Sequence, residues 1–358
     1  MSVPVVQLGD LVWAHYGKAL KQEDRDPTGS AVVYGSSGEV GRHCEALTQE
    51  PTIVVGRKGS VGAITFAPNG GWVIDTAYFL ERKNPDELDL RYLFHALRCV
   101  DLAKDTITTS IPGLNRDDLL ANGIRVPKID EQRHIAAILD RADSLRHKRQ
   151  EAIRLADTLR RSVFVQMFGD PDLNPKAWPV LPMGKVIEFK GGSQPPKETF
   201  VSEAMPGYVR LVQIRDFKTD KYKTYIPEQL AKRSFEKDDV MIARYGPPVF
   251  QILRGLSGSY NVALMKAQPK PNVLKEFVFW LLQLPKYQSA VISNSERTAG
   301  QTGVNLDFLN ALEVPLPPLA YQEEIAAAMV KISATVEKQQ AMLKESEKLV
   351  ASLQAQFF

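Results

Sequence analysis

The sequence predicts an α+β protein: two similar mixed α/β globules separated by two long antiparallel coiled-coil helices, with a pseudo-twofold internal repeat. Three observations lead to this fold class. The second half of the chain repeats motifs of the first half in the same order. Residues 131–168 and 321–356 contain neither proline nor glycine and carry apolar residues at three-and-four spacing. The other stretches contain short β-branched runs bounded by turn residues.

The clearest repeat consists of two segments about 190 residues apart. The first segment is Val126-Pro127-Lys128-Ile129-Asp130-Glu131-Gln132-Arg133-His134-Ile135-Ala136-Ala137. The second is Leu316-Pro317-Pro318-Leu319-Ala320-Tyr321-Gln322-Glu323-Glu324-Ile325-Ala326-Ala327. They share the pattern Pro-x-x-x-x-Gln-x-x-Ile-Ala-Ala. A repeat of this length indicates one folded module used twice, and two like surfaces suit a bipartite ligand better than a single active site.

The repeat extends into the globules in preserved order, which indicates duplication. Four further pairs of segments match: Leu8-Gly9-Asp10-Leu11 with Met183-Gly184-Lys185-Val186, Gly56-Arg57-Lys58-Gly59 with Ala243-Arg244-Tyr245-Gly246, Tyr92-Leu93-Phe94 with Phe279-Trp280-Leu281, and Gly113-Leu114-Asn115 with Gly303-Val304-Asn305.

The first globule is expected over residues 1–128. Short strands are predicted at 31–34, 52–55, 63–66, 72–74 and 77–80, each bounded by turn residues. A helix is predicted at 88–100, because Leu90, Leu93, Phe94 and Leu97 share one side of it.

A first long helix follows at 129–169, with Asp130 as a plausible N-cap and Gly169 with Pro171 as the stop. At 1.5 Å per residue it would be a rod of roughly 55 Å, which favours a coiled coil. A connector is expected at 170–185, a second globule of short strands and turns at 186–318, and a second long helix at 319–358.

The apolar stripes of the two helices are expected to pack against each other, and surplus apolar positions such as Leu349 beside Val350 would leave surface for partner helices. The stripe positions that we assign to helix pairing or partner binding are Ile135, Ile138, Leu139, Leu145, Leu159, Ile325, Met329, Ile332, Val336, Leu343 and Leu353.

Composition excludes several classes of protein. The 45 Lys and Arg residues nearly balance the 42 Asp and Glu residues, for a net charge of +3, so any nucleic-acid binding must come from local basic patches. Cys44 and Cys99 lack metal-ligand spacing and are interpreted as free thiols, without a metal site. No signal peptide or membrane-length apolar run is present, so we expect a cytoplasmic protein with no membrane partner.

Sequence motifs for catalysis are absent. An adenine methyltransferase needs Asn or Asp before Pro-Pro-aromatic, whereas Gly246-Pro247-Pro248-Val249 has glycine there and valine at the end. Gly56-Arg57-Lys58-Gly59-Ser60 has the residue types of a phosphate-binding loop in the wrong order, and a tight turn is the simpler interpretation. The five histidines show no ligand spacing. This agrees with a protein that is not an enzyme.

The ordered motifs resemble the specificity (S) subunits of type I restriction–modification systems. The pattern Val-Pro-x-Ile-x-Glu-Gln-x-x-Ile-Ala at 126–136 is similar to the segment that opens each central helix in that family. The exit Met167-Phe168-Gly169-Asp170-Pro171 is similar too, and Tyr34-Gly35-Ser36-Ser37-Gly38 followed by residues 52–62 resembles the interior of a target recognition domain. The resemblance covers essentially the whole chain.

The resemblance implies two target recognition domains that each read one half of a split double-stranded DNA sequence. The helices would set the gap and dock two methyltransferase (M) subunits, and restriction (R) subunits would join for cleavage in phage defence. The chain itself would bind no cofactor, and S-adenosylmethionine would belong to the methyltransferase partner that carries out DNA methylation. The chain is short for the family, and Ala320-Tyr321 replaces Asp130-Glu131, so the second helix could contact its partner differently.

Candidate DNA-binding residues are donors on predicted turns, because base edges and phosphates are contacted by Arg, Lys, amides and hydroxyls. They are Ser36, Ser37, Arg42, Arg57, Lys58, Ser60 and Thr109 in the first globule, and Arg210, Gln213, Arg215, Arg244, Tyr245, Arg297, Gln301 and Thr302 in the second. The competing interpretation is that lone surface Arg and Lys only solubilise the protein. Arg57 and Arg244 are the strongest candidates because they occupy matched positions beside a glycine in both repeats.

Two other functions remain open at this point. One is a specificity-like DNA-binding subunit of another phage-defence system, which neighbouring genes would distinguish. The other is a scaffold with two protein-binding globules, which would lack salt-dependent binding to duplex DNA.

Overall fold

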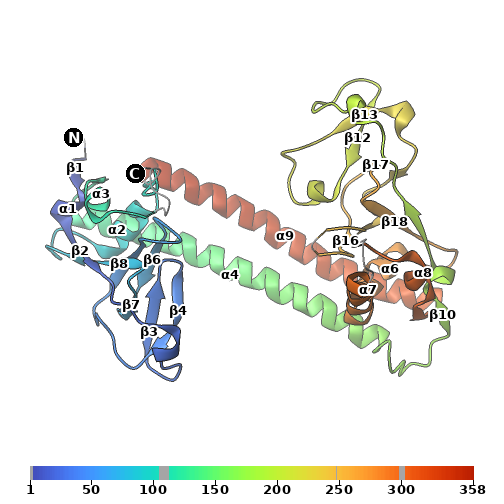
Figure 1. The fold of residues 1–358 in the computed structure, drawn as a ribbon, viewed down its shortest axis with the longest axis horizontal. Coiled ribbons are helices and arrows are strands. Elements are labelled where there is room, and N and C mark those ends of the chain that lie inside the picture. Colours follow the sequence, from blue (N-terminus) through green and yellow to red (C-terminus); the bar gives the residue numbers. More distant parts are fainter. Residues whose placement is uncertain (1–2, 105–112, 247, 298–302) are drawn as a thin grey trace. The chain divides into compact units, whose positions relative to one another are not determined.

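A computed structural model describes residues 3–104, 113–246, 248–297 and 303–358 of the chain. It divides into two compact units: unit 1 comprises Met1–Glu151 and Ala341–Phe358, and unit 2 comprises Ala152–Gln340. The two long helices, α4 (Ile129–Phe168) and α9 (Leu319–Phe357), each belong partly to both units. Each unit therefore combines one globule, the start of the helix that follows it, and the end of the other long helix (Figure 1).

The described residues of the unit 1 globule form three small sheets, with strand orders β2-β8-β5-β6, β4-β3-β7 and β1-β9. Its strands are β1 (Val5–Gln7), β2 (Val12–Tyr16), β3 (Ala31–Gly35), β4 (Gly38–His43), β5 (Thr52–Gly56), β6 (Ile64–Ala67), β7 (Trp72–Val73), β8 (Ala77–Arg82) and β9 (Gly123–Arg125). Its short helices are α1 (Leu8–Leu11), the 3-10 turn η1 (Gln22–Asp24), α2 (Leu90–Leu97) and α3 (Arg116–Leu120).

The globule of unit 2 repeats this plan, with orders β11-β18-β15-β16, β13-β12-β17-β14 and β10-β19. Its strands are β10 (Val180–Pro182), β11 (Ile187–Gly191), β12 (Tyr208–Val212), β13 (Tyr225–Pro227), β14 (Ser234–Phe235), β15 (Val240–Ala243), β16 (Ile252–Leu253), β17 (Gly258–Tyr260), β18 (Leu264–Pro269) and β19 (Glu313–Pro315). Its helices are α5 (Met183–Val186), the 3-10 turns η2 (Lys197–Thr199), η3 (Ile214–Phe217) and η4 (Glu228–Leu230), α6 (Lys275–Leu281), α7 (Pro285–Arg297) and α8 (Leu306–Ala311).

The predicted duplication is confirmed by strand register as well as by strand order. β3 runs parallel to β7 and β12 runs parallel to β17, which is an unusual pairing inside otherwise antiparallel sheets. The central strands also end alike, because Gly56 pairs with Ala77 and Ala243 pairs with Leu264. The two globules are thus one topology used twice.

One predicted match is displaced by two residues. Ring contacts pair Tyr92 with Phe358 at 5.5 Å in unit 1 and Phe277 with Phe168 at 5.6 Å in unit 2. Tyr92 therefore corresponds to Phe277, not to Phe279. The loop before α6 is shorter than the loop before α2, so a constant spacing along the sequence misaligns these helices.

The predicted strands of the first globule are all present, with bounds shifted by one or two residues. The predicted helix at 88–100 is α2, which begins after Asp89 because that carboxylate accepts a hydrogen bond from the Tyr92 amide at 2.8 Å. Strands β1, β2, β4 and β9 were not predicted. Residues 180–185, within the predicted connector, form β10 and the start of α5.

The recurring glutamine of the repeat is a buried residue whose hydrogen bonds join a long helix to its globule. Gln132 has no exposed surface, accepts a hydrogen bond from the Asp89 amide at 2.8 Å, and donates to the Glu87 and Pro127 carbonyls at 2.9 and 2.8 Å. The side-chain amide of Gln132 thus joins the start of α4 to the loop before α2. All three bonds require an amide group at the end of a side chain as long as that of glutamine.

Gln322 makes the same three bonds in unit 2. It accepts from the Leu274 amide at 3.0 Å and donates to the Asn272 and Pro317 carbonyls at 3.2 and 2.9 Å. This equivalence explains why the repeat retains Gln at a place where a helix leaves its globule.

A second polar contact, between α2 and α4 in unit 1, is replaced by a different one in unit 2. The buried ring of His95, on α2, forms a 2.7 Å hydrogen bond with Asp140 on α4, and Arg91 also pairs with that carboxylate. Burial lowers the pKa of His95 although the Asp140 carboxylate opposes this shift. In unit 2 the corresponding residue is Trp280, which donates to Glu276 at 2.7 Å and has no charge to lose.

The long helices run antiparallel within each unit. In unit 1, Ile135 and Leu139 near the start of α4 share a core with Leu353 and Phe357 at the end of α9. In unit 2, the Tyr321 hydroxyl, near the start of α9, donates to the Met167 carbonyl at 2.9 Å near the end of α4.

The apolar positions assigned to the two long helices differ in burial. Ile135, Leu139, Ile325, Met329 and Val336 are buried. Half-buried positions are Ile138, Ile332, Leu343 and Leu353. Leu145 and Leu159 are 46% and 52% exposed, so their side chains are available for the second of the two assigned roles, partner binding.

The Ala320-Tyr321 substitution has a local structural role. Tyr321 stacks on Trp178 with ring centroids 5.0 Å apart, and its hydroxyl receives a hydrogen bond from Lys176 at 2.6 Å. Residues of the connector are therefore held against the start of α9 inside unit 2. In the described part of the chain, no helix combines the length and apolarity needed to cross a membrane.

Candidate nucleic-acid interface

Arg57 and Arg244 occupy the same backbone position, immediately after the central strands β5 and β15. The Arg57 amide donates to Thr76 and its carbonyl accepts from Leu114, at 2.8 and 2.9 Å. The Arg244 amide donates to Ala263 and its carbonyl accepts from Val304, at 2.8 and 3.1 Å. The predicted match between these arginines is therefore confirmed in the hydrogen-bonding of the backbone, and both side chains leave the sheet at the same edge.

Each arginine is followed two residues later by a glycine with left-handed backbone geometry. Gly59 has φ of 78° and Gly246 has φ of 91°, a region that side chains rarely adopt. The turn therefore requires glycine in both repeats. It presents the residue between the arginine and the glycine, Lys58 or Tyr245, to solvent.

In unit 1 the structure brings several candidates together. The β3–β4 turn, with half-buried Ser36 and exposed Ser37, approaches the loop after β5. A Cβ on Gly59 would lie 3.3 Å from the Ser36 hydroxyl, and one on Gly56 would lie 2.0 Å from the Ser60 carbonyl. Ser36, Arg57, Lys58 and Ser60 thus share one surface. Arg42 lies exposed on β4.

The surroundings of Arg57 contain two aromatic rings and a second arginine. Its guanidinium lies 5.2 Å from the ring centroid of Tyr16 and 5.9 Å from that of Tyr78, and it donates to the Asp75 carbonyl at 3.2 Å. The Arg116 guanidinium lies 5.5 Å from the same Tyr16 ring. Tyr16, the last residue of β2, is 50% exposed.

Tyr78 is the buried aromatic residue beside the Arg57 guanidinium. Its hydroxyl donates to the Leu114 carbonyl at 3.0 Å, and burial raises its pKa, so the ring is a neutral support for the arginine.

Tyr16 and Arg116 were not among the candidates from sequence. Tyr16 ends an unpredicted strand and carries no local signal. Arg116 does carry one, because it directly follows the repeated Gly-x-Asn motif, whose Asn115 accepts from the Asp117 amide and caps α3. A polar residue just after a recurring cap is a place to look for surface chemistry.

Two candidates in unit 2 are occupied with internal structure. Arg210 donates to Asp220 at 2.9 Å, lies 3.8 Å from Asp216, and keeps only 17% of its side chain exposed. Gln213 caps η3 reciprocally with Asp216, whose carboxylate accepts from the Gln213 amide at 2.7 Å. Both hold the β12–β13 connection in place, and neither is free to reach a ligand without breaking these bonds.

Other candidates in unit 2 remain on the surface. Arg215 is exposed on η3 with its guanidinium 5.6 Å from the Tyr222 ring. Arg244 lies over the exposed ring of Tyr245 at 5.3 Å, and its Nε is buried with no hydrogen-bond acceptor among the described residues. The expectation of a loop at Arg297 is wrong, because α7 extends to that residue. Thr109, Gln301 and Thr302 lie outside the described residues.

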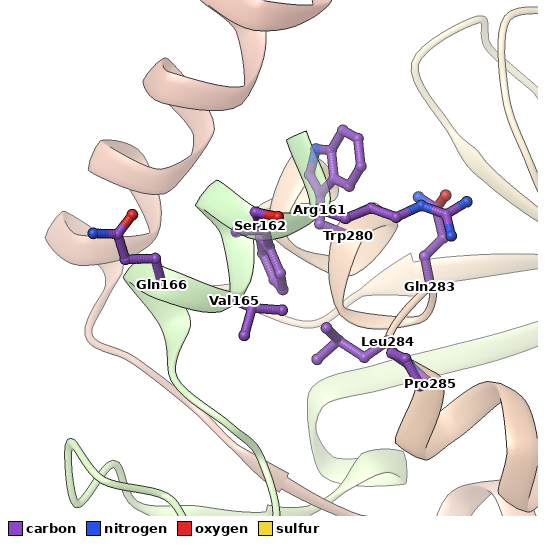
Figure 2. A pocket seen from close by; sticks show the side chains of 9 residues that line it. Arg161, Ser162, Val165, Gln166, Trp280, Gln283, Leu284 and Pro285 are labelled. Carbon is purple, nitrogen blue, oxygen red and sulfur yellow. The ribbon is translucent and has the colours of Figure 1, made fainter. Parts of the chain in front are cut away.

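An apolar cavity of about 450 Å³ in unit 2 lies between the end of α4 and the α6–α7 junction (Figure 2). Val165 and Leu284 border the same space from these two elements (Figure 2). The lining has no carboxylate, histidine or thiol and therefore lacks a general acid, general base or activated nucleophile. It is a feature of packing and of surface shape.

Within the ranges that the structure describes, no group of three or more His, Cys, Asp or Glu side chains is placed to hold a metal ion. Cys44 and Cys99 are free thiols, as predicted.

Comparison with known proteins agrees with the duplicated fold. The MjaVIII specificity subunit of a type I restriction enzyme from Methanocaldococcus jannaschii is 21% identical over 383 residues, which span 98% of this chain and 87% of that protein. The S subunit of a type I restriction-modification system from M. genitalium shares the fold with a TM-score of 0.68 at 18% identity, over 99% of this chain and 96% of that one.

A second solved chain is similar, from a study of complex assembly and conformational transition in the type I R-M system. It has a TM-score of 0.56 at 19% identity and covers 100% of this chain and 98% of that one. The family model for the type I restriction modification DNA specificity domain matches residues 2–155 and 175–345, one stretch for each repeat. The chain therefore belongs to the family of type I restriction–modification specificity subunits.

Proposed function

We propose that this chain is a non-catalytic DNA-specificity subunit that binds a bipartite double-stranded target, with one half-site for each globule. The observation that carries the proposal is the repeated sheet edge, where Arg57 and Arg244 leave equivalent strands beside a left-handed glycine turn. Arginine on such an edge suits both guanine edges and phosphates. Two copies of one surface suit a split target better than a single continuous one.

The partners that we propose are two methyltransferase (M) subunits and restriction (R) subunits. Exposed apolar residues on the long helices support protein docking, because Leu155, Leu159 and Leu349 are 53%, 52% and 58% exposed. S-adenosylmethionine would bind the methyltransferase subunits, and this chain would bind no cofactor. The similarity of the M. jannaschii specificity subunit over nearly the whole chain supports the proposal of partner subunits.

A protein-binding scaffold is the rival function. It explains two like globules but gives no reason for matched arginines at a sheet edge. Salt-dependent binding to duplex DNA would distinguish the two functions, since release of counterions is expected only for the DNA-binding protein.

The proposal is tested by exchanging the first globule. Residues 1–128 are replaced with those of a family member of different specificity, the chimera is produced with its methyltransferase subunits, and modified bases are mapped in the host genome. One half-site should change and the other should persist. An unchanged target, or loss of both half-sites in a complex that still assembles, would contradict one globule per half-site.

A further inference from the structure

We propose that Tyr16, Arg57 and Arg116 form a phosphate clamp in unit 1, which grips the DNA backbone, and that unit 2 lacks an equivalent. This inference rests on the proposed function, because it names the part of the nucleic acid that one described site contacts. It concerns Tyr16 and Arg116, neither of which is a candidate from sequence.

The clamp consists of two cations on one exposed ring. The guanidinium groups of Arg57 and Arg116 lie 5.2 and 5.5 Å from the centroid of Tyr16. Two like charges sharing one ring repel each other unless an anion lies close to both. Among the described residues, no ion pair includes Arg57, Lys58 or Arg116, so no carboxylate of that part of the chain neutralises this local positive charge.

The positions of the three groups are set before any ligand arrives. Tyr16 pairs with Tyr78 in the β2–β8 ladder. Arg57 is held through its amide, its carbonyl and the Asp75 carbonyl, and Arg116 is the first residue of a capped helix. A preformed pair of forked donors matches the geometry of a phosphate and loses little side-chain freedom on binding.

Phosphate is favoured over a base edge by the way Arg57 is held. One of its terminal nitrogens already donates to Asp75, and its guanidinium lies against two tyrosine rings at the sheet edge. An arginine that reads guanine in the major groove must extend and present two free donors to one base. An arginine whose guanidinium is fixed at the protein surface can contact only the outermost groups of a bound duplex, and these are the backbone phosphates.

Unit 2 has different residues at every corresponding position except the arginine. Gly191 ends β11 where Tyr16 ends β2, Tyr245 replaces Lys58, and Leu306 begins α8 where Arg116 begins α3. Only Arg244 remains charged. Unit 1 should therefore contribute more of the salt dependence of DNA binding, although the two globules share one topology.

The test uses the complex of this chain with its methyltransferase subunits and two duplexes. One duplex carries the target mapped from modified bases in cells that express the complex, and the other carries the same bases shuffled. Binding constants are measured over a range of salt concentrations for the wild type, Arg116→Ala and Tyr16→Leu, with Tyr16→Phe as a variant that keeps the ring. Lys344→Ala removes an exposed charge from α9 in the same unit and is the charge control.

Arg116→Ala should weaken binding to both duplexes by the same factor and reduce the slope of log K against log salt by about 0.9, the value for one phosphate contact. Tyr16→Leu should act in the same direction, Tyr16→Phe should bind like the wild type, and the modified sequence should not change. An unchanged slope in Arg116→Ala, or an equal loss in Lys344→Ala, would overturn the clamp.

A relaxed target at one base pair in Arg116→Ala would also overturn it, in favour of base reading. If the wild-type complex itself shows no salt-dependent binding to either duplex, the proposed function fails, and that outcome is distinct from failure of the clamp alone.

Discussion

The recurring glutamine gives the sharpest prediction about stability, because the structure shows what each of its atoms does. In Gln132→Leu the side chain keeps a similar size but loses three hydrogen bonds, which leaves the Asp89 amide and the Glu87 and Pro127 carbonyls without this partner in a buried site. Each such bond stabilises the folded state by about 1 kcal/mol. After the gain from burying leucine, we expect unit 1 to lose about 2 kcal/mol.

The loss should be local, because Gln132 ties one helix start to one loop. Hydrogen exchange followed by mass spectrometry, on the complex with its methyltransferase subunits, reports the two units separately. Amides of residues 88–98 should exchange roughly 30-fold faster in Gln132→Leu, since 1.4 kcal/mol corresponds to a factor of ten. Residues 274–282 should be unaffected, and Gln322→Leu should give the reverse pattern.

Gln150→Leu is the matched control, since Gln150 lies exposed on the same helix. It should leave both regions unchanged. A less than threefold change in Gln132→Leu, or equal acceleration in both units, would refute the idea that this amide group fastens each helix to its own globule.

Three further predictions follow from particular contacts. Burial lowers the pKa of His95 in the folded state, so folded unit 1 binds fewer protons than the unfolded chain as the pH falls through about 6.5. The stability of unit 1 should therefore drop between pH 7 and 5, and hydrogen-exchange measurements should show that His95→Gln removes this drop. The double variant Leu155→Asp, Leu159→Asp should weaken binding of methyltransferase subunits at least tenfold in pull-down titrations. The circular dichroism of the chain should not change, because both side chains are exposed. Unchanged affinity would show that the methyltransferase subunits do not bind these two leucines. Arg210→Met should lower the stability of unit 2 in urea unfolding, whereas Arg215→Ala should leave that stability unchanged and lower the affinity for DNA. If Arg210→Met leaves the stability unchanged and Arg215→Ala lowers it, the ion pairs of Arg210 do not hold its loop.

The duplication and the long helices were predictable because both depend on local or repeated pattern. Long stretches without proline or glycine, with apolar residues at helical spacing, give helices whatever lies around them. The match between Arg57 and Arg244 was also found from sequence, since the glycine that follows each one is required by a left-handed turn. The repeat containing Gln132 marked a structural junction before its hydrogen bonds were known.

Other features depended on contacts between distant residues. Strands β1 and β9 are three residues long and exist through pairing across more than 100 residues, which no local pattern records. The two-residue shift that matches Tyr92 with Phe277 follows from a loop length, so constant spacing misplaced it. Arg210 and Gln213 had the composition of DNA-binding residues, yet Asp216 and Asp220 engage them after folding.

The sequence by itself determined that one module is used twice, that each copy leads into a long helix, and that an arginine beside a glycine recurs at the same place. These follow from residue order and from backbone preferences that act over a few residues. Only the tertiary structure decided which surface groups are free and which are engaged, because that depends on strands β2 and β8 and helix α3 meeting at one edge. The grouping of Tyr16, Arg57 and Arg116 comes from that meeting, and no spacing along the chain encodes it.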